Sequence, residues 1–238
     1  MRRWAWLAAV CLSGAALGET VNLYPSRDTT IYSEDSGASN GLGQWMFAGR
    51  TGTGSTRRAL VNFRVAGIIP DGAVIENVSV RLHMSRTTSG AQDVGLHRLL
   101  ASWGENISDA GGNEGAGAPA SPNDATWRYR FYDAIAWNTP GGDFVGAASA
   151  TKSVASVEYY VFSSTQMTAD VQHWLDNPDE EFGWLIKGNE SSSRTAKRFD
   201  SGDNSTNDFR PILKVTYSVP EPAAALLLLV GAFALRRR

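Results

Sequence analysis

Several short stretches of this chain alternate between hydrophobic and polar side chains with a period of two. In residues 78–84, Val, Val, Leu and Met alternate with Ser, Arg and His, and three further stretches behave similarly: 58–65, 182–187 and 212–217. Successive side chains of a strand point to opposite faces of a sheet, so this period predicts strands with one buried face. Gly, Asn, Asp and Ser separate the stretches, as turns between strands require.

The spacing of these stretches predicts an all-β fold. A further segment, 154–162, is rich in β-forming residues. About nine to eleven short strands fit between the turns, which suits one antiparallel β-sandwich of roughly 200 residues. Two stretches with little hydrophobic periodicity, 104–124 and 200–208, are predicted to be long loops.

One segment predicts a short helix that closes an end of the sandwich. Val171, Trp174 and Leu175 are spaced i, i+3, i+4 and so share one helical face. Thr168 is expected to cap the helix and Pro178 to end it.

Residues 1–18 have the parts of a secretory signal peptide. Arg2 and Arg3 precede an apolar run over 4–17, and small residues end at Gly18. We expect signal peptidase to cleave after Gly18. The single cysteine, Cys11, lies in this segment, so the remaining chain has no disulfide and no cysteine-based zinc site.

Residues 219–238 combine a Pro-Glu-Pro motif, an apolar run over 223–235 and a terminal arginine cap. As a helix the run would be about 20 Å long, short of the ~30 Å hydrocarbon core. This order of parts resembles the PEP-CTERM sorting signal, which implies recognition and removal by exosortase during export. The alternative is a simple membrane anchor. The residues that carry the resemblance are Pro220, Glu221, Pro222, Arg236, Arg237 and Arg238.

The charge excludes a pervasive basic field for nucleic acid. The whole chain has a formal charge of −2. Removing both ends takes away five arginines and one glutamate, which leaves 17 basic and 23 acidic residues and a charge of −6 in residues 19–218. Binding to an anionic partner would therefore need a local cluster of cations.

Ten segments between these ends occur in a recognisable order: 28–32, 40–43, 58–63, 102–105, 125–130, 136–144, the predicted helix around Trp174, 183–187, 198–201 and 210–217. Together they resemble the DNRLRE domain, family 96 of the carbohydrate-binding modules. The sequence departs from that pattern at 62–64 and again after 201. The resemblance implies a jelly-roll-like sandwich over residues 19–218 that binds a polysaccharide, which for some members of the family is alginate.

Four basic residues lie in segments that match this family: Arg58, Lys187, Arg198 and Arg210. Guanidinium groups pair with carboxylates in a fork, so neighbouring strands would make these residues one patch for an acidic sugar. The alternative is scattered surface charge or structural ion pairs.

Aromatic rings offer faces on which sugar rings pack. Trp137 precedes a Pro-Gly-Gly turn, and Tyr129 and Tyr132 lie in the loop before it. These three are candidate sugar contacts, with core packing as the alternative for Trp137.

The acidic loop at 200–208 is a candidate calcium site. Asp200, Asp203 and Asp208 offer the oxygen ligands that calcium prefers, although their spacing is not that of an EF-hand. The alternative is a solvated, turn-rich loop. The predicted function requires no cofactor.

No zinc-hydrolase motif is present, and we predict no enzymatic activity. The chain lacks HExxH, and its three histidines have no metal-ligand spacing. A Ser-His-Asp triad needs only to meet in space, which leaves that possibility open.

Together these patterns predict an exported, non-catalytic carbohydrate-binding module. Its partner would be an acidic polysaccharide, alginate-like or the host's exopolysaccharide, at the cell surface or in the biofilm matrix. Export would pass through the inner membrane and periplasm. One alternative is a structural or adhesive extracellular matrix protein without a defined sugar site. The other is a small polysaccharide lyase or hydrolase.

Overall fold

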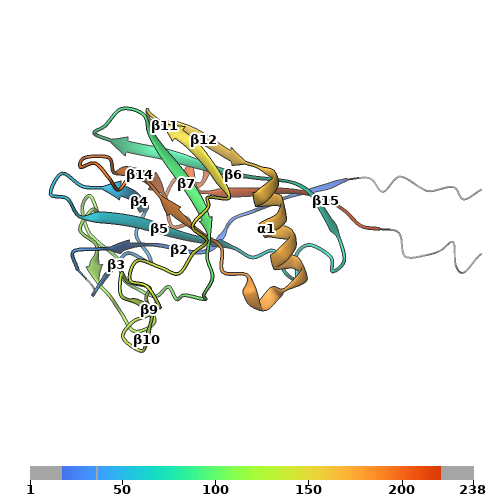
Figure 1. Ribbon diagram of the computed structural model, residues 1–238, viewed down its shortest axis with the longest axis horizontal. Coiled ribbons are helices and arrows are strands. Elements are labelled where there is room, and N and C mark those ends of the chain that lie inside the picture. The colour runs from blue at the N-terminus through green and yellow to red at the C-terminus, as the bar shows by residue number, and fades with distance from the viewer. Residues whose placement is uncertain (1–17, 36, 221–238) are drawn as a thin grey trace, which may run out of the picture.

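The computed structural model describes residues 18–35 and 37–220, which form a jelly-roll-like all-β sandwich (Figure 1). The main sheet has 11 strands, all paired antiparallel, and curls into two layers. Its strands are β1 (Glu19–Leu23), β2 (Pro25–Tyr32), β4 (Trp45–Arg50), β5 (Thr56–Phe63), β6 (Val74–Thr87), β7 (Gln92–Arg98), β11 (Ala150–Val154), β12 (Glu158–Ser163), β13 (Trp184–Lys187), β14 (Lys197–Asp200) and β15 (Ile212–Ser218). The remaining elements are β3 (Ala38–Ser39), β8 (Ala118–Pro119), β9 (Tyr129–Phe131), β10 (Ile135–Ala136), helix α1 (Thr165–Asp176) and the 3-10 turns η1 (Pro178–Glu180) and η2 (Asn207–Phe209).

Strand β4 joins the two layers. It pairs with β14 over residues 45–48 and then with β5 at Gly49 and Arg50. The first layer holds β1, β15, β14, β6 and β12, built around the long strand β6. The second layer holds β2, β5, β13, β7 and β11.

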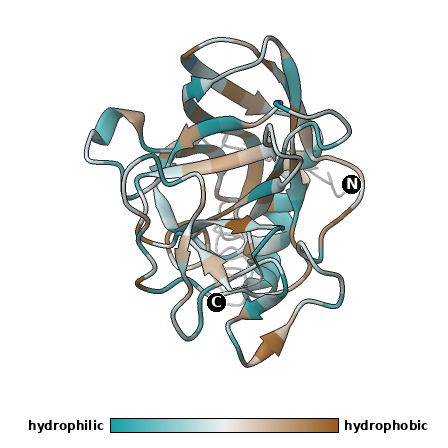
Figure 2. Ribbon diagram, turned by 90° about the vertical axis from the view of Figure 1, so that its left-hand side faces the viewer, coloured by the Kyte–Doolittle hydropathy of each residue, from teal (hydrophilic) through white to brown (hydrophobic). Residues whose placement is uncertain are grey.

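The alternation in the sequence becomes the buried face between the layers. Val78, Val80, Leu82 and Met84 of β6 are fully buried, as the period of two predicts. They pack in one cluster with side chains of the second layer, among them Val61. Figure 2 shows hydrophobic and hydrophilic positions following one another along the strands.

Helix α1 closes one end of the sandwich, as predicted, but it begins earlier than the sequence indicated. Ser164 caps it, because its Oγ accepts a hydrogen bond from the backbone N–H of Met167 at 3.0 Å. Thr168, the expected cap, lies inside the helix, where its hydroxyl bonds back to the carbonyl of Ser164. Pro178 starts η1 directly after the helix.

A second hydrophobic cluster covers part of the outer face of the second layer. Leu60 of β5 and Leu185 of β13 point away from the main core, yet both are fully buried. The irregular segment between β7 and β11 covers them with Trp103 and Trp137. The cluster also contains Ile31 of β2, Leu99 and Ala125. This segment therefore conceals one half of an outer sheet face.

The predicted ends of the chain fall mostly outside the described residues. The signal-peptide and sorting-signal predictions rest on 1–17 and 221–238, and only Pro220 of the sorting motif is described. Across 18–35 and 37–220, no helix is long and apolar enough to span a membrane. Strands β1 and β15 pair side by side, with Glu19 opposite Tyr217.

Candidate functional site

The uncovered half of the second layer's outer face forms a groove. Four residues lie side by side in register across four strands: Arg58 of β5, Lys187 of β13, Gly95 of β7 and Thr151 of β11. A Cβ at Gly95 would lie 2.9 Å from Nε2 of His97 and 3.3 Å from Cβ of Ala148. The absence of a side chain at Gly95 thus keeps the floor of the groove low.

The groove has a volume of about 620 Å³ and a mostly polar lining. Seven lining residues carry hydrogen-bonding side chains: Gln92, Asp93, His97, Thr151, Lys187, Asn189 and Ser191. Four of these side chains already make hydrogen bonds within the protein. Asn189 Nδ2 donates to Gln92 Oε1 at 2.8 Å, Ser191 Oγ donates to Asn189 Oδ1 at 2.8 Å, and His97 Nδ1 lies 3.0 Å from the carbonyl oxygen of Val145. A dense set of donors and acceptors in an open groove suits a ligand rich in hydroxyl groups.

A second cavity of about 470 Å³ continues the groove, and the two share Gly146 as a lining residue. Phe144 lines this second cavity, and its ring meets the imidazole of His97 edge-on at 5.3 Å between centroids. The Nζ of Lys187 lies 5.7 Å from the centre of the same ring. One half-buried aromatic ring therefore stands where the two cavities meet.

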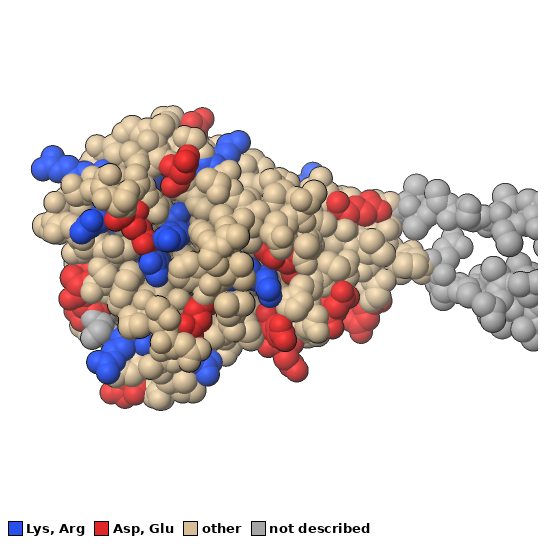
Figure 3. Space-filling model, in the orientation of Figure 1, with Lys and Arg blue, Asp and Glu red and all other residues tan. Residues whose placement is uncertain are grey.

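The cations beside the groove are largely balanced. Arg58 makes a fork with Glu190, with Nε–Oε1 at 2.7 Å and Nη2–Oε2 at 2.9 Å. Lys187 Nζ lies 4.0 Å from the same carboxylate, and Asp93 adds a second negative charge. Burial lowers the pKa of His97, and the charges of Lys187 and Arg58 lower it further. In the view of Figure 3, basic and acidic groups are interspersed over the end of the molecule away from the termini, and mostly acidic groups lie towards the termini.

The four predicted basic residues do not form one patch. Arg58 and Lys187 are cross-strand neighbours beside the groove. Arg198 lies in the other layer, on β14, with its guanidinium 4.0 Å from the ring centre of Trp45. Arg210 follows η2 and donates from Nε to the carbonyl of Asn204 at 2.8 Å. The sequence predicted the strands that carry these residues. It did not show that the strands belong to different layers of the sandwich.

The three predicted aromatic contacts also separate. Trp137 is only 4% exposed, and its indole N–H donates to the carbonyl of Thr126 at 2.9 Å, so the ring belongs to the second hydrophobic cluster. The prediction that Trp137 is an exposed sugar contact is therefore wrong, and the alternative of core packing holds. Tyr129 and Tyr132 are half-buried and meet edge-on at 5.8 Å between centroids, outside the residues that line the groove.

Sequence reasoning missed most of the groove lining. His97, Asn189 and Ser191 come from different strands and turns, so no local spacing links them. One signal was present at Gly95, because a lone glycine within a strand often marks a close approach of another group.

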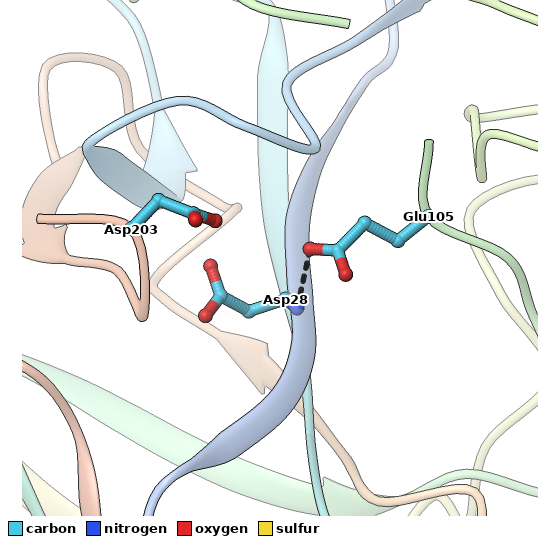
Figure 4. A group of neighbouring side chains, drawn as sticks. All are labelled: Asp28, Glu105 and Asp203. Carbon is cyan, nitrogen blue, oxygen red and sulfur yellow. Dashed lines mark hydrogen bonds between the residues drawn. The ribbon is translucent and has the colours of Figure 1, made fainter. Parts of the chain in front are cut away.

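The predicted calcium ligands separate as well. Asp200 is buried, and both of its carboxylate oxygens already have partners in the protein. Its Oδ2 lies 2.5 Å from Nδ1 of His83, and its Oδ1 accepts a hydrogen bond from Asn204 Nδ2 at 2.9 Å. Asp208 is exposed on η2. Asp203 instead approaches Asp28 of β2 and Glu105 of the segment after β7 (Figure 4).

These three carboxylates form a compact acidic cluster, with one oxygen of each lying within 4.8 Å of the others. Asp28 is 2% exposed. Burial raises the pKa of Asp28 to about 8, with the charge of Asp203 adding to the effect. Burial and the charge of Asp28 raise the pKa of Glu105 to about 8, and burial also raises the pKa of Asp203.

Residues 18–35 and 37–220 contain no hydrogen bond between a serine or threonine hydroxyl and a histidine. His83 bonds to Asp200, His97 to the carbonyl of Val145, and His173 to Glu180 and Asn177. The imidazole of His83 is also stacked under Phe209 at 4.1 Å between centroids. A Ser-His-Asp arrangement needs the missing contact between hydroxyl and imidazole.

Comparison with known proteins returned no assignment. No family model matches the chain, and no curated protein matches it.

Proposed function

We propose that this protein is an exported, non-catalytic polysaccharide-binding module whose ligand lies in the groove over β13, β7 and β11. The observation that carries the proposal is the groove of about 620 Å³ with seven hydrogen-bonding side chains. The hydroxyl groups of sugar chains both donate and accept hydrogen bonds, and this lining contains acceptors and donors for them. The resemblance to the DNRLRE domain supports the same class of ligand.

The groove also offers partners for both surfaces of a sugar ring. Its polar side chains suit the hydroxyl edge, while Phe144 and the imidazole of His97 suit the C–H face. The adjoining cavity of about 470 Å³ extends the length available to a chain of several sugar units. A polymer therefore suits the site better than a single sugar.

The preference for an acidic polymer rests on Lys187. Arg58 is held by Glu190, so Lys187 is the cation with the greater exposure, 33% of its side chain against 13% for Arg58. Asp93 adds a negative charge to the same groove lining. The proposed ligand is accordingly a hydroxyl-rich chain with spaced carboxylates, and a densely charged polyanion would bind less well.

Affinity electrophoresis of the purified protein tests this proposal. Gels would contain alginate, other uronic-acid polymers, neutral glucans and the host exopolysaccharide. We expect retardation in at least one gel. Lys187→Ala should reduce it, whereas the matched variant Lys214→Ala on β15 in the other layer should not.

Three results would contradict the proposal. Equal effects of Lys187→Ala and Lys214→Ala on retardation would show that the groove is not the binding site. No retardation in any gel would favour the alternative of a structural or adhesive matrix protein, in which the sandwich serves only as a packing unit. Release of sugar fragments during long incubation would instead support a lyase or hydrolase.

The proposal includes the route of export. We infer from the sequence that signal peptidase removes residues 1–18 and that exosortase processes 219–238, which would deliver residues 19–218 to the cell surface or matrix. Mass spectrometry of the protein recovered from the medium and from the cell surface tests both cleavages. Retention of residues 219–238 in the recovered protein would support a simple membrane anchor.

A further inference from the structure

The acidic cluster of Asp28, Glu105 and Asp203 lies apart from the groove and plays no part in the proposed function. Its members come from three separate segments: strand β2, the segment after β7 and the loop after β14. Figure 4 shows the three carboxylates converging on one region, with Asp28 between the other two. The repulsion between such carboxylates is relieved either by proton uptake, which the raised pKa values of Asp28 and Glu105 reflect, or by a bound cation.

One oxygen of Asp28 has no partner among the described residues. Asp28 is 2% exposed, and its Oδ2 accepts a hydrogen bond from the backbone N–H of Gly202 at 2.7 Å. Its Oδ1 is buried and accepts no hydrogen bond. A buried acceptor without a donor costs free energy, so this atom points to a missing electropositive ligand.

No side-chain cation of the described chain supplies that charge. The charges of Arg27 and Arg210 lower the pKa values of Glu105 and Asp203, respectively, yet no Lys, Arg or His nitrogen in residues 18–35 and 37–220 lies within 4.0 Å of the three carboxylates. Arg27 is directed elsewhere, because its Nη1 donates to the carbonyl of Trp103 at 2.6 Å.

The spacing of the oxygens fits a calcium ion. An ion held about 2.4 Å from three oxygens requires them to lie within about 4.8 Å of one another. The oxygens of Asp28, Glu105 and Asp203 meet that limit. Calcium accepts irregular sets of carboxylates and waters, whereas magnesium demands near-octahedral geometry at shorter distances. Because Asp203 is exposed, water can complete the coordination.

We propose that Asp28, Glu105 and Asp203 form a calcium site that joins β2, the segment after β7 and the loop after β14. The site lies beside the start of the segment that covers the outer sheet face, where Glu105 Oε1 also accepts from the backbone N–H of Asp28 at 2.8 Å. A bound ion would hold this covering segment against β2. Its role is thus to stabilise the fold at a point distinct from the groove.

Isothermal titration of the purified protein, after removal of divalent ions with EDTA, tests the site. We expect one calcium ion to bind per chain. Saturating calcium chloride should raise the midpoint of thermal unfolding by about 5 °C. Magnesium chloride at the same concentration should raise it less. Neither measurement includes a polysaccharide, so failure here would leave the groove proposal intact.

Asp203→Asn is the most informative variant, because this side chain is exposed and its replacement disturbs no buried packing. It should weaken calcium binding by roughly tenfold or more, the scale at which metal sites respond to loss of a supporting group. Asp179→Asn, an exposed residue of η1 outside the cluster, is the matched control and should bind as the unaltered protein does.

Three results would overturn the proposal. The first is no heat of binding and no stabilisation up to about 10 mM calcium, above the ~1 mM dissociation constants of weak extracellular calcium modules. The second is unaltered calcium binding by Asp203→Asn. The third is equal stabilisation by magnesium, which would exclude a calcium-selective site. Glu105→Gln provides an independent variant, which should also bind calcium more weakly.

Discussion

Arg58 and Glu190 form a two-pronged ion pair at the edge of the groove, with Nε–Oε1 at 2.7 Å and Nη2–Oε2 at 2.9 Å. The guanidinium also donates from Nη1 to the carbonyl of Gly141 at 2.7 Å and lies 4.8 Å from the ring centre of Trp127. The arginine therefore fixes the loop beside the groove while its charge is neutralised by the protein itself.

Glu190→Gln should strengthen binding to anionic polymers. The change removes the negative charge that balances Arg58 and Lys187, while the amide oxygen can still accept a hydrogen bond. Affinity electrophoresis at low and high salt measures the effect, which should shrink as salt screens the charge. Glu158→Gln, an equal change of charge on the first layer, is the control. Equal gains from both variants would mean that only net charge matters.

Gly95→Ala should weaken polysaccharide binding by filling the floor of the groove. The new methyl group would occupy part of the groove floor and lie 2.9 Å from Nε2 of His97, so the imidazole of His97 must shift. Gly90→Ala is the matched control, because a Cβ there meets no atom within 4 Å. Retardation in polysaccharide gels compares the two. If Gly95→Ala bound as well as the control, the ligand would not pass over β7.

Trp137→Phe should lower stability without a direct effect on binding. The change removes the hydrogen bond to the carbonyl of Thr126 and leaves a small void in the second hydrophobic cluster. The free energy of unfolding should fall by about 1–3 kcal/mol, as urea denaturation would measure. Tyr129→Phe, on a half-buried ring, should change it little. A loss of binding with unchanged stability would instead make Trp137 a sugar contact.

The calcium-free protein should lose stability as the pH rises from about 4 to about 8. The pKa values of Asp28 and Glu105 are raised to about 8 in the folded protein, so the folded state retains protons that the unfolded state has released. This contribution to stability is complete below the unfolded pKa of about 4 and disappears as the pH passes the folded value.

Urea denaturation in the presence of EDTA, at several pH values, measures this dependence. Asp28→Asn cannot ionise and should show a flatter profile over the same range. A profile of the unaltered protein that rises towards pH 8 and matches that of Asp28→Asn would contradict the prediction.

The sequence predicted the buried faces well, because strand periodicity is local. Residues 78–84 showed which side chains of β6 point inward. The helix was also predicted, although its first turn was missed because Ser164 lies outside the apolar pattern that marks the rest. The upper end of the predicted nine to eleven strands equals the 11 strands of the main sheet, but the four short strands β3, β8, β9 and β10 were not predicted.

Contacts between distant segments could not be predicted in this way. Leu60 and Leu185 looked like residues of an exposed face, and only the segment after β7 explains their burial. Trp137 looked accessible because it precedes a turn. The fold instead places it in the same hydrophobic cluster as these leucines. Asp203 was read with its sequence neighbours, whereas the structure joins it to residues 28 and 105.

The sequence by itself thus determined that the chain forms strands with one apolar face and that these strands suffice for a sandwich. The tertiary structure decided which outer face is covered, which half remains as a groove, and which charges meet. The physical reason lies in the range of the interactions. Side-chain periodicity depends on adjacent residues, but burial, ion pairing and clusters such as Asp28, Glu105 and Asp203 depend on segments brought together only when the two layers close.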